Sequence, residues 1–293
     1  NRIVAAHDYR VLQPRRVTDP NGNRSEAAYD TLGLVAGSAV MGKVGESAGD
    51  SLDGFSANLT EAQITAFLTD PLAHAPALLG RASSRFLYDL HRYRREAQPG
   101  FTAATAGERH AAEPPPGEAT AVHLSLSSSD GAGRVIQSKT PAEPGPLTPE
   151  EPPLAVRWVA TGWTVFNNKG KPVRQYEPFF DDSPVYLPGK RVGTSSVLFY
   201  DPLGRVVASL QPDHTWSKSL FSPWRKEEWD VNDTVLISDP RTDPDVGAYF
   251  DRLESALFLP SWYDARKDGA LGEHERAAAR KAAAHAATPS RLY

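Results

Sequence analysis

Short segments in which apolar and polar residues alternate recur along the chain, and they predict β-strands. VHLSLS and RVIQSK flank residues 130–134, SVLFY and RVVASL flank residues 201–205, and WTVF precedes residues 167–171. An alternation with a period of two places successive side chains on opposite faces of a strand. Two such segments joined by a tight turn form an antiparallel hairpin, so the pattern predicts a mainly antiparallel β-protein.

One turn pattern separates these strands five times. It consists of Asp or Asn, two further residues and Gly, usually followed by a basic or polar residue. In DPLGR the Asp201 carboxylate can accept backbone N–H groups, Pro202 fixes φ, and Gly204 is expected at positive φ. The irregular spacing indicates a degenerate repeat. The predicted turn residues are Asp19 and Gly22, Asp30 and Gly33, Asp130 and Gly133, Asn167 and Gly170, and Asp201, Gly204 and Arg205.

Helical segments interrupt the predicted hairpins. Near residues 60–70, Thr60 and Gln63 form a capping box, and Pro71 is expected to end the helix. DPDVGAYFDRLESALFLP, near residues 244–259, has apolar residues at helical spacing, and the Ala-rich segment near 272–287 predicts an exposed helix. Pro-rich connectors are expected near 111–118 and 141–153. We interpret residues 1–293 as one repeat segment of a longer chain that begins here with Asn.

Composition excludes several partners and chemistries. The 293 residues carry a formal net charge of −4, which leaves no basic surplus for nucleic acid. No apolar run approaches the roughly 20 residues of a membrane helix, so we expect no direct membrane insertion. The chain has no cysteine, so thiolate catalysis and cysteine–zinc sites are excluded.

The candidate sites for chemistry are weak. Asp19, Asn21 and Asn23 have the spacing of an early calcium loop, but Arg24 and Asp30 replace its Gly and Glu, which favours a hairpin turn. The eight histidines show no paired metal-ligand spacing; His7, His91, His123 and His214 stand singly. Nucleophile-elbow, P-loop and dinucleotide motifs are absent. We therefore predict no catalytic residue, no metal and no cofactor.

Tryptophans and acidic residues in the C-terminal half permit an alternative function. A sugar-binding or sugar-cleaving groove would combine stacking aromatics with paired carboxylates. Adjacent carboxylates on a strand point to opposite faces, however, so we expect the doublets Asp181/Asp182 and Glu227/Glu228 to be exposed and without function. The tryptophans are expected to fill apolar sheet faces. The residues concerned are Trp158, Trp163, Trp216, Trp224, Trp229, Asp181, Asp182, Glu227, Glu228 and Asp230.

Several blocks of the sequence resemble one protein family. YDPLGRVV is similar to the Tyr-Asp (YD) or RHS repeat, although Leu34 replaces the usual Arg in the second turn and Ser129 the usual Tyr before the third. Four longer blocks resemble the B component of bacterial insecticidal toxin complexes. They are VLQPRRVTDPNGNRSEAAYDTLGLVAGSAVMGK, GWTVFNNKGKPVRQYEPFF, SPWRKEEWDVNDTVL and LGEHERAAARKAAAHAATP. The resemblance extends over nearly the whole chain and is weakest through residues 95–120.

The resemblance implies an architecture and a role. In this family, RHS-repeat strands wind into a β-spiral shell that, with the C component, encloses a toxic C-terminal segment; other parts of the B component dock on the pore-forming A component. It implies a structural segment without enzymatic activity, whose partners are the C component with its enclosed segment and the A component. Secretion as part of the toxin complex, after a cytoplasmic stage, is the implied location. The self-cleaving aspartates of the C component have no matching motif here. The alternative stays a carbohydrate-binding or carbohydrate-active surface β-protein.

Overall fold

The computed structural model describes residues 2–113, 121–190 and 192–293. The chain divides into two compact units, which are described separately. The first unit contains residues 1–161 and 179–190, and the second contains residues 162–178 and 191–293. Each unit is built on one antiparallel sheet, of ten strands in the first and seven in the second. The predicted mainly antiparallel β fold is confirmed.

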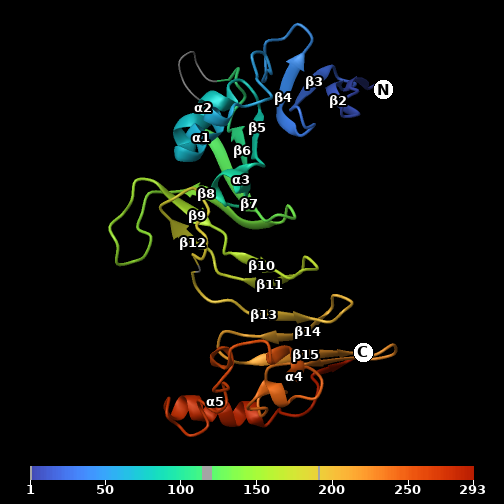
Figure 1. Ribbon diagram of the computed structural model, residues 1–293. Coiled ribbons are helices and arrows are strands. Elements are labelled where there is room, and N and C mark those ends of the chain that lie inside the picture. Colours follow the sequence, from blue (N-terminus) through green and yellow to red (C-terminus); the bar gives the residue numbers. More distant parts are fainter. Residues whose placement is uncertain (1, 114–120, 191) are drawn as a thin grey trace. The chain divides into compact units, whose positions relative to one another are not determined.

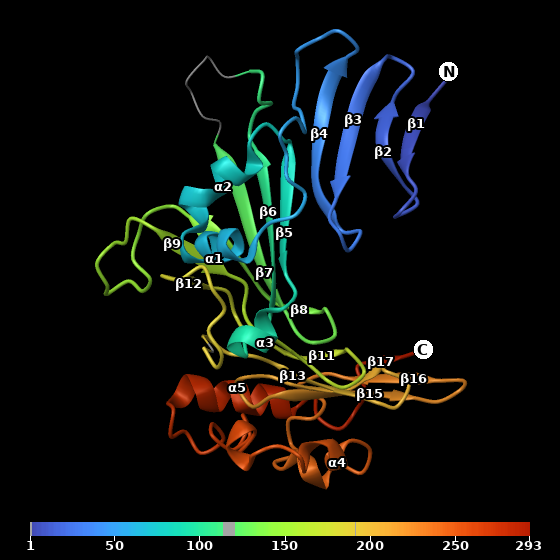
Figure 2. The ribbon, with the colours of Figure 1, turned by 45° about the horizontal axis from the view of Figure 1, so that its top comes forward.

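The sheet of the first unit follows the order of the chain almost throughout. Its strands lie in the order β1-β2-β3-β4-β5-β6-β7-β8-β9-β12, and Figure 2 shows the first seven in a row. Predicted strands VHLSLS and RVIQSK form the paired β7 and β8. The bounds are β1 Val4–Asp8, β2 Gln13–Thr18, β3 Asn23–Tyr29, β4 Val35–Lys43, β5 Ser84–Asp89, β6 Gly100–Gly107, β7 Val122–Ser129, β8 Val135–Ala142, β9 Arg157–Ala160 and β12 Phe179–Asp181.

Two helices cover one face of this sheet (Figure 2). Helix α1, Glu61–Thr69, begins with the predicted capping box, in which Thr60 Oγ1 accepts from the Gln63 backbone N–H. Helix α1 ends just before Pro71, as expected, but a second helix begins at that proline. Asp70 caps this second helix, α2 (Pro71–Leu79), because a proline at the first helical position needs no hydrogen-bond acceptor for its nitrogen. The buried cluster under the helices contains Phe67, Ala75, Leu87, Phe101, Ala103, Leu124, Leu126 and Trp158.

The sheet of the second unit has the strand order β10-β11-β13-β14-β15-β16-β17. Figure 1 shows β10, β11, β13, β14 and β15 in succession. Its covered face packs on the C-terminal segment through a cluster of Val197, Phe199, Ala208, Leu210, Trp216, Val246, Phe250 and Phe258. The bounds are β10 Thr164–Phe166, β11 Pro172–Gln175, β13 Val197–Tyr200, β14 Val206–Leu210, β15 Trp216–Phe221, β16 Lys226–Trp229 and β17 Arg291–Leu292.

The helix predicted near residues 244–259 is mostly not formed. Only α4, Gly247–Phe250, and a short 3₁₀ turn, Ser255–Leu257, are helical there. The carboxylates of Asp243 and Asp245 both bind Lys218 Nζ at 2.7 Å. Asp243 lies at the start of the predicted segment, where its carboxylate also accepts from the backbone N–H groups of Asp245 and Val246. The short turns that follow place Val246, Phe250 and Phe258 in the buried cluster without a continuous helix.

The remaining segments follow the predictions more closely. Helix α5, Glu273–Ala283, forms within the predicted 272–287 segment, and a short helix α3, Arg92–Glu96, follows β5. A 3₁₀ turn, Pro240–Thr242, precedes α4. The connector predicted near 141–153 begins as part of β8 and continues without regular structure apart from a bridge between Gly145 and Leu154. Of the connector predicted near 111–118, residues 114–118 lie outside the described residues.

Candidate functional site: the hairpin turns and buried lysines

The first residue of each predicted turn organises the turn with both its backbone and its side chain. At Asp201 the backbone N–H donates to Arg205 O and the carbonyl accepts from Gly204 N, both at 3.0 Å. The carboxylate accepts from the backbone N–H of Arg205 at 2.9 Å and from its Nε at 2.7 Å. These hydrogen bonds lower the pKa of Asp201. The three-residue loop is a type I turn closed by a left-handed residue.

The other four turns repeat this geometry. In each, the Asp or Asn backbone N–H donates to the fifth residue and its carbonyl accepts from the glycine, at distances from 2.9 to 3.1 Å. In each, its side-chain oxygen accepts from the N–H groups two and four residues later. The predicted positive φ is found at every glycine: +87° at Gly22, +84° at Gly33, +77° at Gly133, +75° at Gly170 and +81° at Gly204.

The tyrosine of a Tyr-Asp pair ties its strand to the preceding one. Tyr29, on β3, donates its hydroxyl to Pro14 O of β2 at 3.0 Å. Tyr200, on β13, donates to Pro172 O of β11 at 2.8 Å, and burial raises the pKa of this phenol. The pair therefore has two tasks, because the aspartate shapes the turn while the tyrosine crosses to the neighbouring strand.

Sequence reasoning missed a third Tyr-Asp pair, at the end of β5. Tyr88 donates its hydroxyl to Val35 O of β4 at 3.0 Å, as the other two tyrosines do to their neighbours. Asp89 is buried and binds Arg95 at 2.6 Å, and helix α3 takes the place of a tight turn. The YD dipeptide was the available signal, but no glycine follows three residues after Asp89.

A sixth turn of the same geometry was also missed. Gln211 N donates to Thr215 O at 2.8 Å, and His214 N donates to Gln211 O at 3.1 Å. His214 takes the place of the glycine at a φ of +69°, and its Nδ1 lies 2.7 Å from Pro260 O. A left-handed non-glycine residue carries a conformational cost, so the Asx–x–x–Gly pattern did not identify this turn, although Pro212 and Asp213 are turn-forming residues.

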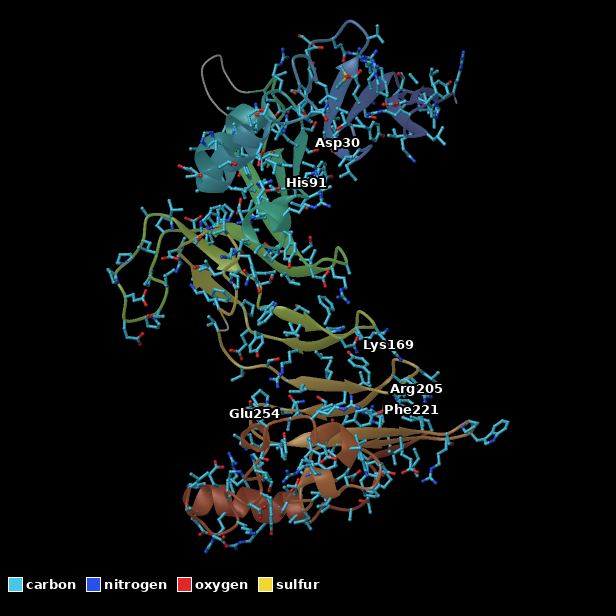
Figure 3. All side chains as sticks on the ribbon, in the orientation of Figure 1. Asp30, His91, Lys169, Arg205, Phe221 and Glu254 are labelled. Atoms are coloured by element: carbon cyan, nitrogen blue, oxygen red, sulfur yellow. The ribbon has the colours of Figure 1, made fainter. Side chains whose placement is uncertain are left out.

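Neighbouring turns touch one another. In the second unit, Lys169 Nζ donates to Pro202 O, and the Arg205 guanidinium lies 4.3 Å from the centre of the Phe221 ring. Figure 3 shows Lys169, Arg205 and Phe221 at the same end of the strands. A Cβ atom on Gly33 would lie 2.8 Å from Val11 Cγ1, in the adjacent β1–β2 turn. The glycine is thus required by close approach as well as by φ.

A buried lysine anchors the segment that follows β12 to the sheet of the first unit. Lys139, on β8, donates from Nζ to Asp181 Oδ2 at 2.6 Å, Ser183 O at 2.9 Å and Val185 O at 2.6 Å. Lys190 Nζ binds the other oxygen of Asp181 at 2.8 Å. Burial lowers the pKa of Lys139. Burial of Asp181 acts to raise its pKa, but the bonds from both lysines hold it below its ordinary value.

A second buried lysine performs the same task in the second unit. Lys218, on β15, binds Asp243 and Asp245, and its Nζ lies 4.8 Å from the centre of the Trp229 ring. Burial acts to lower the pKa of Lys218, but the two carboxylates raise it above its ordinary value. Sequence reasoning missed both lysines. The available signal for Lys218 was its place two residues after Trp216, on the same face of a strand.

The expectation that the acidic doublets are exposed is wrong for Asp181. Its side chain is 1% exposed because Lys139 and Lys190 bind it, whereas Asp182 is exposed. Glu227 and Glu228 are half-buried, and Glu228 binds Lys226.

The tryptophans fulfil the packing expectation only in part. Trp158 and Trp216 are buried in the two cores, and Trp163 stacks on Tyr176 with a ring separation of 6.2 Å. Trp229 is half-buried beside Lys218. Trp224 is 93% exposed in the β15–β16 connection, so its expected place on an apolar sheet face is wrong. Trp224 lies within the turn that Ser222 N closes on Arg225 O at 2.8 Å, outside both strands.

The candidate calcium loop is a hairpin turn. Asp19 accepts from the backbone N–H groups of Asn21 and Asn23 and from Asn23 Nδ2, and this side-chain bond lowers its pKa. Throughout the described part of the chain, no three His, Asp or Glu side chains gather as metal ligands would. His91 begins α3, and His123 faces Glu108 at 3.6 Å.

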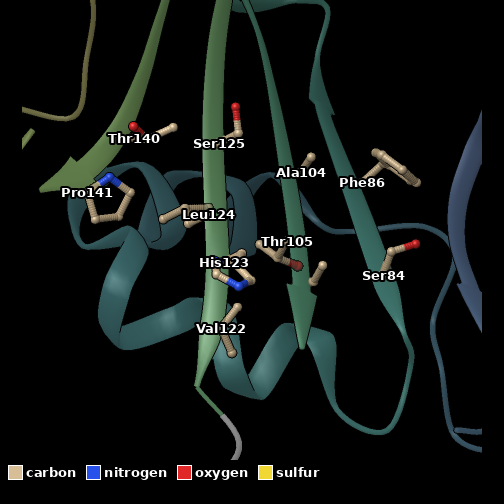
Figure 4. Close-up of a pocket in the computed structure, with 11 residues that line it drawn as sticks. Ser84, Phe86, Ala104, Thr105, Val122, His123, Leu124, Ser125, Thr140 and Pro141 are labelled. Carbon is tan, nitrogen blue, oxygen red and sulfur yellow. The ribbon is translucent and has the colours of Figure 1, made fainter. Parts of the chain in front are cut away.

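A hollow lies on the first sheet, across strands β5 to β8 (Figure 4). Its volume is about 480 Å³, and small side chains such as Ser84, Ala104 and Ser125 line it together with Phe86 and His123. Serines pair across this sheet, with Oγ–Oγ distances of 2.7 Å for Ser38–Ser84 and 3.1 Å for Ser127–Ser138. The face therefore presents short, uncharged polar groups.

The described helices are all shorter or more polar than a bilayer crossing requires.

Neither a family model nor a curated protein sequence matches the chain. Solved structures do match. The crystal structure of TcdB2–TccC3 is 23% identical with a TM-score of 0.64 and is matched over 82% of this chain. The TcdB2–TccC3–Cdc42 crystal structure is 20% identical over 79% of this chain, with a TM-score of 0.61. The Photorhabdus luminescens Tc holotoxin pore is 19% identical over 83%, with a TM-score of 0.60.

These comparisons establish a likeness of fold. The matched region corresponds to 12% of the TcdB2–TccC3 chain and to 14% of each of the other two chains, so this chain spans a small part of the proteins it resembles. At these identities the likeness concerns the arrangement of strands and helices. The chain thus has a toxin-complex-like, mainly antiparallel β fold.

Proposed function

We propose that this chain is a wall segment of the hollow RHS-repeat shell of a bacterial toxin complex, which encloses the toxic C-terminal segment of a C component. The observation that carries the proposal is the series of Asx–Gly hairpin turns on a fold like that of the TcdB2–TccC3 chains. Each turn fixes the strand direction, and each Tyr-Asp tyrosine ties a strand to its neighbour. A wall requires such strand-to-strand continuity.

The proposed role is structural and not enzymatic. Its partners would be the C component with its enclosed segment and, through other parts of a longer chain, the A component. The assembly would be secreted. Two features support a wall: the tight turns along the sheets, and buried lysines that fasten the covering segments to them.

Two tryptophans of the second unit provide a matched test. Trp216 is 3% exposed in the core, and Trp224 is 93% exposed. Trp216→Ala should destabilise the wall by about 3–5 kcal/mol, as truncation of a buried tryptophan does. The assay is protease sensitivity of the enclosed segment in the B component that contains this chain, co-expressed with its C component. Trp216→Ala should expose the segment, and Trp224→Ala should leave it protected.

The same two variants can also contradict the proposal. Unchanged protection in Trp216→Ala, with the core loosened in thermal unfolding, would mean that this chain does not enclose the segment. Glycan binding that disappears in Trp224→Ala while the fold is intact would instead favour the carbohydrate-binding alternative.

A further inference from the structure

The carboxylate of Asp50 joins three separate segments of the first unit. Asp50 lies in the connection between β4 and α1, and its side chain is 3% exposed. Ser83, in the turn before β5, donates its hydroxyl to Oδ2. The backbone N–H of Ala111, in the segment after β6, donates to Oδ1 at 2.6 Å. From the same segment, Nδ1 of His110 lies 2.9 Å from Oδ2.

Backbone hydrogen bonds fix two of these three segments to β4. Asp50 N donates to Val40 O of β4 at 2.8 Å, and Val40 N donates to Ser83 Oγ at 2.8 Å. Asp50 and Ser83 are thus held on the strand, whereas His110 and Ala111 reach them from beyond the end of β6. The bonds to Asp50 therefore fasten the segment after β6 to β4.

The protonation of the His110 ring follows from its acceptor. Burial acts to raise the pKa of Asp50, but the bonds from Ser83, Ala111 and His110 hold it below its ordinary value. The ionised carboxylate can only accept, so Nδ1 carries a hydrogen in the neutral ring as well, and the second proton goes to Nε2. The His110 side chain is 44% exposed, so this proton can exchange with solvent. Protonation converts a hydrogen bond from a neutral ring into an ion pair.

The charged groups that act on His110 favour the protonated ring. The hydrogen bond and the charge of Asp50 raise the pKa of His110 above its ordinary value of 6.5, burial opposes this, and the carboxylate of Glu113 adds to it. The turn before β5 contributes Ser83, which shares the Asp50 oxygen and does not titrate. The stabilisation by the ion pair is therefore complete below 6.5 and is lost as the pH rises through the folded pKa.

We propose that Asp50 and His110 form a pH-sensitive latch, which fastens the segment after β6 to β4 more tightly at low pH than at high pH. At high pH the neutral ring keeps its hydrogen bond from Nδ1 but loses its charge, so the segment opens more often. The N–H of Ala111 reports this opening, because it donates to the same carboxylate. The proposal is independent of the toxin-shell function, since it concerns one contact within the first unit.

Amide hydrogen exchange of Ala111 tests the latch. After correction for the intrinsic exchange rate, the protection of Ala111 should fall about two- to fivefold between about pH 5 and about pH 8, the effect of one partly exposed ion pair. Amides of β14, in the second unit, should show no such fall. His110→Gln keeps a side-chain donor that does not titrate, so the protection of Ala111 should become independent of pH.

The matched control is His123→Gln. His123 faces Glu108 at 3.6 Å, with the two side chains 74% and 50% exposed, and its replacement should leave the pH dependence at Ala111 unchanged. NMR titration should give a midpoint above 6.5 for His110, and Asp50→Asn should lower that midpoint. A pH dependence that persists in His110→Gln, or a His110 midpoint at or below 6.5, would overturn the proposal. A fall in the protection of β14 equal to that of Ala111 would also overturn it, because the effect would then be global.

Discussion

Lys139 and Lys218 are buried cations on the covered faces of two different sheets, and their surroundings balance charge differently. Lys139 shares one carboxylate, that of Asp181, with a second lysine and satisfies its remaining donors with two backbone carbonyls. Lys218 has two carboxylates to itself. The pKa is lowered at the first lysine and raised at the second. Burial acts to lower the pKa at both lysines; the two carboxylates around Lys218 outweigh it, whereas the carboxylate that Lys139 shares with Lys190 does not.

The largest expected effect comes from removing the carboxylate that two lysines share. Asp181→Ala leaves Lys139 buried without a counter-ion and should destabilise the first unit by about 3–5 kcal/mol. Asp182→Ala, the exposed neighbour, should change stability by less than about 0.5 kcal/mol. Urea unfolding of both variants measures the difference. A loss of stability in Asp181→Ala as small as that in Asp182→Ala would show that the Asp181 ion pair contributes nothing.

Replacing each lysine by methionine should destabilise the second unit more than the first. Lys218→Met leaves Asp243 buried without its cation and should cost about 3 kcal/mol. Lys139→Met should cost less, about 1–3 kcal/mol, because Lys190 still neutralises Asp181 and the main loss is a donor to two carbonyls. Thermal and urea unfolding of the two variants test this order. A larger loss in Lys139→Met would contradict this account of the charge balance at the two sites.

Most of the fold was predictable because its signals are local. A turn needs an Asx side chain and a left-handed residue within five positions, and a strand needs alternation over a few residues. The turn at His214 lacks the glycine of the other turns, and its His214 side chain contacts the distant Pro260 O. The short helix α3 after Asp89 was missed although its contact with Arg95 is only six residues away. The buried lysines were missed because their ion pairs join residues that are distant in the sequence.

The helix near residues 244–259 shows the opposite error. Its apolar spacing was a real local preference, but Val246, Phe250 and Phe258 reach the buried cluster from separate short turns and not from one helix.

Alkaline titration should show a pKa below the ordinary value for Lys139 and one above it for Lys218. Because the folded pKa of Lys139 lies below the ordinary value of 10.5, the unfolded chain holds more protons between the two values, and stability rises with pH in that window. For Lys218 the folded pKa lies above 10.5, so its stabilisation is complete below 10.5 and is lost as the pH rises through the folded pKa. NMR titration of ¹³C-labelled lysines, assigned with Lys139→Met and Lys218→Met, measures both. Equal titration midpoints for Lys139 and Lys218 would contradict the opposite pKa shifts.

The smallest expected effect tests why the pKa of Lys139 is lowered. Burial is the main cause, and the positive charge of Lys190 adds to it. The Lys190 side chain is 34% exposed, so Lys190→Gln should cost no more than about 1 kcal/mol, as solvated ion pairs do. The same change should raise the pKa of Lys139, because Asp181 then serves one lysine alone, and leave that of Lys218 unchanged. Lys281→Gln, on the exposed part of α5, is the matched control. An unchanged Lys139 titration in Lys190→Gln would assign the lowered pKa to burial alone and exclude the sharing of Asp181 as a contributing cause.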